Sequence, residues 1–423
     1  MEKNLYDEYS KILREELVPA MGCTEPISLA YAGALAAKHL NALPERIDLM
    51  VSGNIIKNVK SVIVPNTGGR KGLRTAVSAG VVYGDSEREL EVLSRVKEDD
   101  LKKLDDFLDK VEIHISTSDY MNPFDIQVRA YAGEDESFVH IFANHTNVVE
   151  IKRNGEYVLR KEFKDEPLAV KENRRLLTVE NIVEYGDTVD LEEIREVLER
   201  QIEYNMAIAE TGLSEDYGAT IGKILLKAYG DGVQNKAKAY AAAGSDARMN
   251  GCELPVVINS GSGNQGITSS VPVIVYAKEL GAPHEKLLRA LAISNLISIH
   301  IKTGIGSLSA YCGVTSAGAG AGAGISYLHG GGYKEIAHTI VNTLAINSGM
   351  ICDGAKSSCA AKIASAVESG LLGMKMYQQG SQFYDGDGIV IKGVENTINA
   401  IGLLAREGMH ETDKEILKIM MGE

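Results

Sequence analysis

The sequence of 423 residues has no tryptophan, only nine prolines and only five cysteines. A small and odd number of cysteines argues against a disulfide framework and gives more weight to metal binding or catalysis. Glycine, in contrast, occurs 43 times. Because proline does not match this excess, the composition indicates closely packed helices and pockets lined by backbone rather than disorder.

Long apolar runs and an excess of basic residues are also missing. No window offers the roughly 18 strongly apolar residues of a membrane-spanning helix, and the charged residues 1–19 lack the apolar core of a signal peptide. We therefore expect a cytoplasmic protein whose thiols stay reduced. The net charge of −14 argues against nucleic acid and anionic membranes as partners. A small molecule is the expected ligand, and a homodimer is a fair expectation.

Three segments of different character follow one another along the chain. Residues 1–45 predict N-terminal helices that carry Cys23, and residues 46–175 alternate apolar and polar positions between turn residues, as strands do. Residues 176–423 are rich in glycine and alanine and have almost wholly helical patterns. The expected fold is α+β: N-terminal helices, a mostly antiparallel α+β module and a large all-helical domain. We expect AGAGAGAG at 317–324 to be a helix that lets neighbouring backbones approach closely, rather than a silk-like strand.

A glycine-rich stretch in the middle of the chain has residues suited to binding an anion. SGSGNQG at 260–266 fits G-x-G-x-x-G, but no regular series of βαβ units surrounds it, and Ile267 stands where a Walker A loop has lysine. The stretch is either a tight turn or a nest of backbone N–H groups around a carboxylate. The side chains that would assist such a nest are Ser260, Ser262, Asn264, Gln265 and Thr268.

A second loop, VPNTGGRKG at 64–72, allows the same two interpretations. It is either a surface turn or a clamp for a substrate carboxylate, because it combines small polar side chains with two positive charges. The candidate substrate residues in this loop are Asn66, Thr67, Arg70 and Lys71.

Several other motifs are excluded. DGDG at 385–388 starts like a calcium loop, but Val390 replaces the required glycine. No H-E-x-x-H pattern supports a zinc hydrolase. Lys356 has no phosphate-binding stretch beside it, so we expect no pyridoxal phosphate.

The pattern of the cysteines leaves more than one interpretation open. Cys352 and Cys359 are seven residues apart, and on one regular helix their Cα atoms would lie roughly 10 Å from each other, too far for a disulfide. Cys312 is a third thiol among small residues. The spacing C-x6-C is not a usual ferredoxin pattern, so buried inert thiols and ligands of one large cluster both remain possible from spacing.

Five stretches together resemble a known family. GCTEPISLA, NSGSGNQGITSSVPV, AYCGVTSAGAGAGAG, MICDGAKSSCA and DGDGIV are similar to the iron–sulfur L-cysteine desulfidase family, which is itself similar to the alpha chain of bacterial iron–sulfur L-serine dehydratases. The resemblance spans nearly the whole chain in the same order. It implies a 4Fe-4S cluster held by Cys312, Cys352 and Cys359, with one iron open to substrate.

The resemblance also implies roles for the remaining cysteines and a reaction. Cys23 in GCTEP matches the cysteine that is assigned as the catalytic base, whereas Cys252 matches no motif and is read as structural. The implied reaction is β-elimination of L-cysteine to pyruvate, ammonia and sulfide without pyridoxal. L-serine dehydration is the alternative in the same class. A non-enzymatic iron–sulfur sensor and a nucleotide-binding oxidoreductase are alternatives from other classes.

Overall fold

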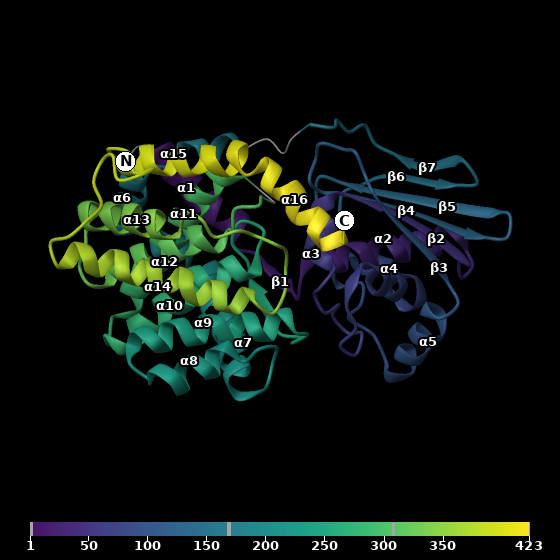
Figure 1. Ribbon diagram of the computed structural model, residues 1–423, viewed down its shortest axis with the longest axis horizontal. Helices are drawn as coiled ribbons and strands as arrows, with labels where there is room; N and C mark the ends of the chain where they lie inside the picture. Colours follow the sequence, from purple (N-terminus) through teal and green to yellow (C-terminus); the bar gives the residue numbers. More distant parts are fainter. Residues whose placement is uncertain (1–2, 167–170, 307–308, 423) are drawn as a thin grey trace.

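The structure is a computed structural model that describes residues 3–166, 171–306 and 309–422. It consists of two lobes that lie side by side (Figure 1). The sheet lobe comprises residues 23–166, and the helical lobe comprises residues 3–21 together with the described residues between 171 and 409. The predicted α+β class, with a mostly antiparallel sheet followed by a large helical region, is confirmed.

The sheet lobe has one six-stranded sheet with helices packed against one face (Figure 1). Its strands are β2 (Arg46–Val51), β3 (Glu112–Thr117), β4 (Asp125–Ala132), β5 (Asp135–Phe142), β6 (Val148–Arg153) and β7 (Glu156–Arg160). Their order is β3-β2-β4-β5-β6-β7, and β2 and β3 pair in parallel whereas the other neighbours pair antiparallel. The helices are α2 (Thr24–Leu40), α3 (Gly53–Val59), α4 (Gly72–Tyr83) and α5 (Glu98–Leu108).

The core of this lobe is built from strand residues that are buried at every second position. Ile126, Val128 and Ala130 of β4 are fully buried at every second position and belong to one cluster with α2. Helix α2 lies in turn against α4, where a Cβ atom at Gly80 would be only 1.8 Å from the carbonyl oxygen of Ala30. Glycine is therefore required for the two helices to touch backbone to backbone.

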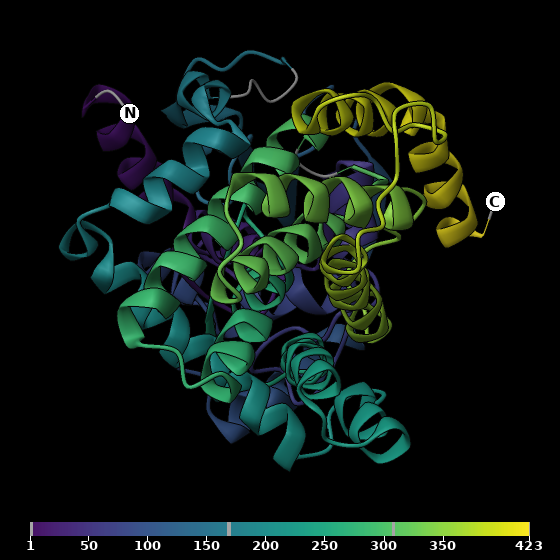
Figure 2. The same cartoon turned by 90° about the vertical axis from the view of Figure 1, so that its left-hand side faces the viewer.

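The helical lobe contains most of the remaining elements. These are α1 (Lys3–Glu16), β1 (Pro19–Met21), α6 (Val179–Thr188), α7 (Arg195–Ser214), α8 (Ile221–Tyr229), α9 (Val233–Met249), β8 (Pro255–Val257), α10 (Gly263–Glu279), α11 (His284–Ile305), α12 (Val314–Leu328), α13 (Tyr333–Asn347), α14 (Cys359–Gln378) and α15 (Val394–Leu403). Short helical turns lie at Glu172–Leu176, Leu191–Glu193 and Leu404–Gly408 in this lobe, and at Ser86–Glu91 in the sheet lobe. Figure 2, which looks onto this lobe, shows α1 and the C-terminal helices on opposite sides of it.

Helix α12 is the packing centre of the helical lobe and contacts α10, α11, α13 and α14. Cβ atoms at Gly318 and Gly322 would lie 2.4 and 2.8 Å from the carbonyl oxygens of Ala366 and Gly370 in α14. The residue numbers of the contacting pairs rise together along both helices, so α12 and α14 run parallel. The prediction that the AGAGAGAG stretch is a helix permitting close backbone approach is confirmed.

The N-terminal residues are divided between the lobes. Helix α1 packs into the core of the helical lobe, and β1 pairs antiparallel with β8. The chain then crosses at Gly22, whose φ of 58° favours glycine, and enters the sheet lobe as α2. The segment bounds 1–45, 46–175 and 176–423 stay a prediction.

The C-terminal helix α16 (His410–Met421) returns from the helical lobe to the sheet lobe (Figure 1). It packs against α3, where the side chain of Leu417 would collide with any Cβ at Gly53. Lys57 Nζ lies 2.5 Å from Asp413 Oδ1, and the Lys57 side chain is almost fully buried. Among the described residues, no helix is both long enough and apolar enough to cross a membrane.

Replacing Gly318 by alanine should destabilise the protein. The added methyl meets the Ala366 carbonyl at 2.4 Å, and overpacking of this kind costs about 1–3 kcal/mol. Gly232→Ala is the matched control, because a Cβ there meets no atom within 4 Å. Urea denaturation measures the free energy of unfolding of both variants. Equal stabilities would contradict the close approach of α12 and α14.

Candidate active site

A cavity of about 450 Å³ lies where the two lobes meet. The helical lobe contributes most of the lining, and the sheet lobe contributes Cys23, Glu25, Asn58, Phe124, Ala143, Asn144 and His145. Four of the five cysteines of the chain line it: Cys23, Cys312, Cys352 and Cys359. The fifth, Cys252, is buried in the core of the helical lobe.

Backbone pairing holds two of these thiols beside each other. The segments before α12 and after α13 form an isolated bridge between Tyr311 and Ile351. The N–H of Cys312 donates to Met350 O at 3.0 Å, and the N–H of Cys352 donates to Ala310 O at 2.6 Å. Cys312 and Cys352 are therefore neighbours in space although forty residues separate them in sequence.

The third thiol reaches the same wall through helix packing. Cys359 is the first residue of α14, and Cys312 stands just before α12. Because α12 and α14 run parallel, their N-terminal ends lie at the same end of the pair. Cys359 Sγ donates a weak hydrogen bond to Gly354 O at 3.6 Å, which directs it toward the loop that carries Cys352.

The electrostatics favour a thiolate at Cys352. A hydrogen bond from the Cys312 thiol lowers the pKa of Cys352 most, with further help from Lys57, the Gly354 N–H and Lys302. The same hydrogen bond, together with burial, raises the pKa of Cys312. Burial lowers the pKa of Lys302 to about 8, and its ammonium donates to Gly306 O.

The three thiols, as sulfur ligands, favour particular kinds of metal. Soft sulfur ligands select iron–sulfur clusters and other soft metals over hard cations such as magnesium or calcium. The described residues have no group of three or more Cys, His, Asp or Glu side chains placed around a single metal ion. A cluster of several irons spreads its thiolates more widely than one ion does, so the donor set fits the larger group by its chemistry.

Cys23 lies at the N-terminus of α2, in the part of the lining that the sheet lobe contributes. Its Sγ–H donates to Glu25 Oε2 at 3.3 Å, and Glu25 Oε1 accepts from Asn58 Nδ2 at 3.3 Å. Burial and then the charge of Glu25 raise the pKa of Cys23 well above its ordinary value, against the opposing charge of Arg248. Cys23 is therefore a neutral thiol with a proton acceptor beside it. Cys359 packs against the small apolar cluster to which Cys23 belongs.

His145 adds a second ionisable group on the side of the sheet lobe. Its Nε2 is buried without a hydrogen-bond partner among the described residues. Burial lowers the pKa of His145, and the ring packs edge-on against Phe124 at 4.5 Å. A neutral imidazole thus faces the cavity.

The two glycine-rich loops have different positions. Ser262, Asn264 and Gln265 line the cavity, at the N-terminal end of α10. Their stretch is a helix start, in which the Ser262 side chain accepts from the N–H of Gln265. The nest interpretation is therefore geometrically possible, whereas the binding of a carboxylate stays a prediction.

The residues of the other loop are not among the residues that line this cavity, and its clamp interpretation stays a prediction. The guanidinium of Arg70 is paired with Asp105 at 2.5 Å, and the Thr67 hydroxyl donates to Val64 O at 2.7 Å. Asn66 donates to Leu93 O, and Lys71 precedes α4 as its N-cap. The side chains of Asn66, Thr67 and Arg70 therefore make contacts within the sheet lobe that hold the turn.

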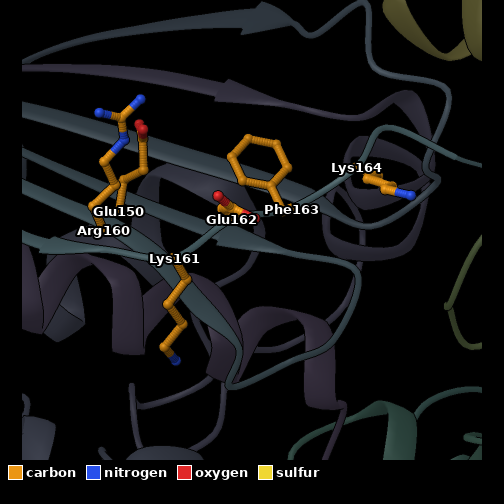
Figure 3. Close-up of a pocket in the computed structure, with 6 residues that line it drawn as sticks. All are labelled: Glu150, Arg160, Lys161, Glu162, Phe163 and Lys164. Atoms are coloured by element: carbon orange, nitrogen blue, oxygen red, sulfur yellow. The ribbon is translucent and has the colours of Figure 1, made fainter.

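A second hollow, of about 530 Å³, lies beside β6 and β7 (Figure 3). It is lined by Glu150, Arg160, Lys161, Glu162, Phe163 and Lys164. Figure 3 shows Lys161 and Lys164 directed away from the other side chains. Neither a thiol nor an imidazole is among these six residues, so the chemistry of the cysteines belongs to the cavity between the lobes.

Comparison with known proteins identifies the family of the chain. Residues 87–418 match the family described as serine dehydratase alpha chain. A UPF0597 protein of Desulfitobacterium hafniense is 54% identical over 418 residues, covering 99% of this chain and 97% of that protein. UPF0597 proteins of Lachnoclostridium phytofermentans and Treponema denticola are 49% and 46% identical, with 99% and 100% of this chain covered and 100% and 99% of theirs.

The chain belongs to the UPF0597 family. Its serine dehydratase alpha chain domain indicates lyase chemistry of the serine dehydratase type, in a domain family that generally depends on iron–sulfur clusters. The resemblance to that alpha chain is confirmed, and the narrower identification as a cysteine desulfidase is not supported by these relatives. Cys312, Cys352 and Cys359 lie within the matched range, whereas Cys23 precedes it.

Sequence reasoning missed several cavity residues of this UPF0597 protein. Glu25 could have been found, because it stands in GCTEP two residues after Cys23. His145, Arg248 and Lys302 could not, because each lies in a stretch with no distinctive local pattern.

Alkylation of the metal-free protein should distinguish these thiols. Cys352 should react with iodoacetamide first and keep its rate down to about pH 6.5, because the thiolate is the nucleophile and its pKa is lowered. Cys23 should react slowly and gain rate only as the pH rises. Peptide mapping by mass spectrometry after chelator treatment measures both. Faster modification of Cys23 than of Cys352 would contradict these assignments.

Proposed function

We propose that this chain is a 4Fe-4S-dependent lyase that converts L-cysteine to pyruvate, ammonia and sulfide by β-elimination. Cys312, Cys352 and Cys359 are the proposed cluster ligands, and Cys23 is the proposed catalytic base. The observation that carries the proposal is the convergence of these four cysteines in one cavity. The serine dehydratase alpha chain domain supports a lyase.

A cluster held by Cys312, Cys352 and Cys359 would supply Lewis-acid chemistry for the departure of the leaving group. The chain itself provides the charge balance, because Lys57 and Lys302 both act on Cys352. Burial of the cavity between the lobes strengthens these interactions, since charges act over a low dielectric there.

The proposed proton transfers use two residues of the sheet lobe, Cys23 and Glu25. Cys23 is a thiol, so it must first pass its proton to Glu25. The Oε2 of Glu25 already accepts a hydrogen bond from the Cys23 thiol, with 3.3 Å between Sγ and Oε2. The thiolate can then take the Cα proton of the substrate. Loss of HS⁻ from Cβ leaves aminoacrylate, which hydrolyses to pyruvate and ammonia. Cα loses a proton and Cβ loses the leaving group with its electron pair, so no oxidant is needed.

L-serine dehydration is the second candidate. It follows the same proton transfers with hydroxide as leaving group, and the description of the matching domain favours it. The affinity of soft sulfide for iron favours cysteine. A non-enzymatic iron–sulfur sensor would not require the thiol–carboxylate pair of Cys23 and Glu25. The proposed partners are a small amino acid and a second copy of the chain, with neither nucleic acid nor membrane.

Anaerobically reconstituted protein should release sulfide and pyruvate in equal amounts from L-cysteine. L-serine should give pyruvate alone, at a lower kcat/KM if cysteine is the substrate. Colorimetric sulfide and coupled pyruvate assays measure the two products. If the reconstituted protein shows cluster absorption but forms no product from either amino acid, the sensor hypothesis would be favoured over the lyase.

Cysteine substitutions should separate cluster binding from acid–base chemistry. Cys312→Ser, Cys352→Ser and Cys359→Ser should each lose iron and the visible absorption, because they remove a soft ligand. Cys23→Ser and Glu25→Gln should keep the cluster and lose about 100-fold or more in kcat, the usual size of a general-base contribution. Cys252→Ser is the control and should keep both. Retention of a full cluster in all three ligand variants would refute the ligand set.

A further inference from the structure

Arg248, near the C-terminal end of α9, is a buried cation at the wall of the cavity. It is 6% exposed and lines the same cavity as the four cysteines. Its Nη1 donates to Asn264 Oδ1 at 3.3 Å. Its Nε has no hydrogen-bond partner among the described residues. A buried guanidinium with an unused donor costs free energy unless an anion completes it.

The guanidinium lies over the start of α10. A Cβ atom at Gly263 would be 2.2 Å from Arg248 Nε and 2.7 Å from its Cζ. Only glycine therefore allows this position. The first intrahelical bond recorded at this end runs from Gly266 N to Ser262 O. Helix geometry leaves the N–H groups of Gly263 and Asn264 without an acceptor inside the helix. Arg248 and the positive end of the α10 dipole thus lie beside each other at the cavity wall.

Gln265 connects this spot to the cysteine wall. It is 4% exposed, and its Oε1 also has no hydrogen-bond partner among the described residues. Its amide packs on Gly313, where a Cβ would come within 2.7 Å of Gln265 Cδ. Gly313 follows Cys312 directly. An unused acceptor therefore lies between the start of α10 and the thiols.

We propose that Arg248, with the first-turn N–H groups of α10, binds the carboxylate of a free α-amino acid, and that the Gln265 amide oxygen accepts a hydrogen bond from its ammonium group. This assignment rests on the proposed function, because it takes the ligand to be the substrate of the lyase. It makes Arg248 the residue that restricts the site to free amino acids. Amines without a carboxylate are not bound.

The position of Arg248 also orients the substrate. Cys23 belongs to one small cluster with Met249, the residue after Arg248, so a carboxylate held by Arg248 places the neighbouring Cα on the side of that thiol. Gln265 then directs the remaining substituents toward Cys312. Cα faces the proposed base, and Cβ with its leaving group faces the wall of three cysteines.

Ligand binding without turnover tests this assignment. L-alanine carries the carboxylate and ammonium groups but has no leaving group, and ethylamine lacks the carboxylate. Saturation-transfer NMR titrations of the full chain, with and without cluster, should show binding of L-alanine and none of ethylamine. Arg248→Met should weaken L-alanine binding roughly 10- to 100-fold, which corresponds to one charge-assisted interaction. Arg248→Lys should have an intermediate effect.

Two further variants keep the test decisive. Gly263→Ala pushes the guanidinium aside without removing it and should reproduce the loss, even where Arg248→Met folds poorly. Arg200→Met is the matched control: within the described part of the chain the Nε of Arg200 also has no hydrogen-bond partner, but Arg200 lies on α7, outside the cavity lining. Unchanged L-alanine affinity in folded Arg248→Met or Gly263→Ala protein overturns the proposal, as does failure of the wild-type protein to bind L-alanine.

The outcomes for the two proposals can be told apart. If L-alanine binding depends on Arg248 but no amino acid is turned over, the carboxylate site stands and the lyase assignment fails. If turnover occurs and Arg248→Met changes only the alkylation of Cys23, Arg248 serves that thiol instead and the anchor is refuted.

Discussion

The close parallel contact of α12 and α14 is the constraint on which the arrangement of the cavity depends. Gly318 and Gly322 let the two backbones touch, and a side chain at either position would separate them. Because the helices are parallel, the contact fixes their N-terminal ends beside each other. Cys312 and Cys359 stand at those ends. The glycine pattern in the middle of the helices thereby positions thiols that lie two turns away.

Helix ends also determine the charge of the cavity. Helices α2, α10, α12 and α14 all begin at its lining, which brings four positive dipole ends together. Arg248 and Lys302 line the same cavity, and the charge of Lys57 acts on Cys352. A chain with a net charge of −14 thus concentrates positive charge where thiolates and carboxylates would bind. Surface charge and site charge have opposite signs, so the composition of the whole chain gives no information about this site.

The division of groups between the lobes has a chemical consequence. The thiol–carboxylate pair of Cys23 and Glu25 belongs to the sheet lobe, and the three cysteines belong to the helical lobe. Their separation depends on how the lobes meet, and the chain secures that contact at both ends. Near the N-terminus, β1 pairs with β8 within the helical lobe and so anchors the chain just before it crosses to Cys23. Near the C-terminus, the ion pair of Lys57 with Asp413 ties α16 to α3.

The sequence by itself determined the α+β class, the helical nature of the AGAGAGAG stretch and the likeness to serine dehydratase alpha chains. Periodic burial and backbone sterics act over a few residues, so local patterns are enough to predict them. It also named the four cysteines that line the cavity, through motifs rather than spacing. Only the tertiary structure decided which glycine-rich loop lines the cavity, because the composition of a loop does not say which distant segments it will meet. The same holds for Arg248, His145 and Lys302: their surroundings come from segments distant in sequence, and burial and pairing are properties of those surroundings.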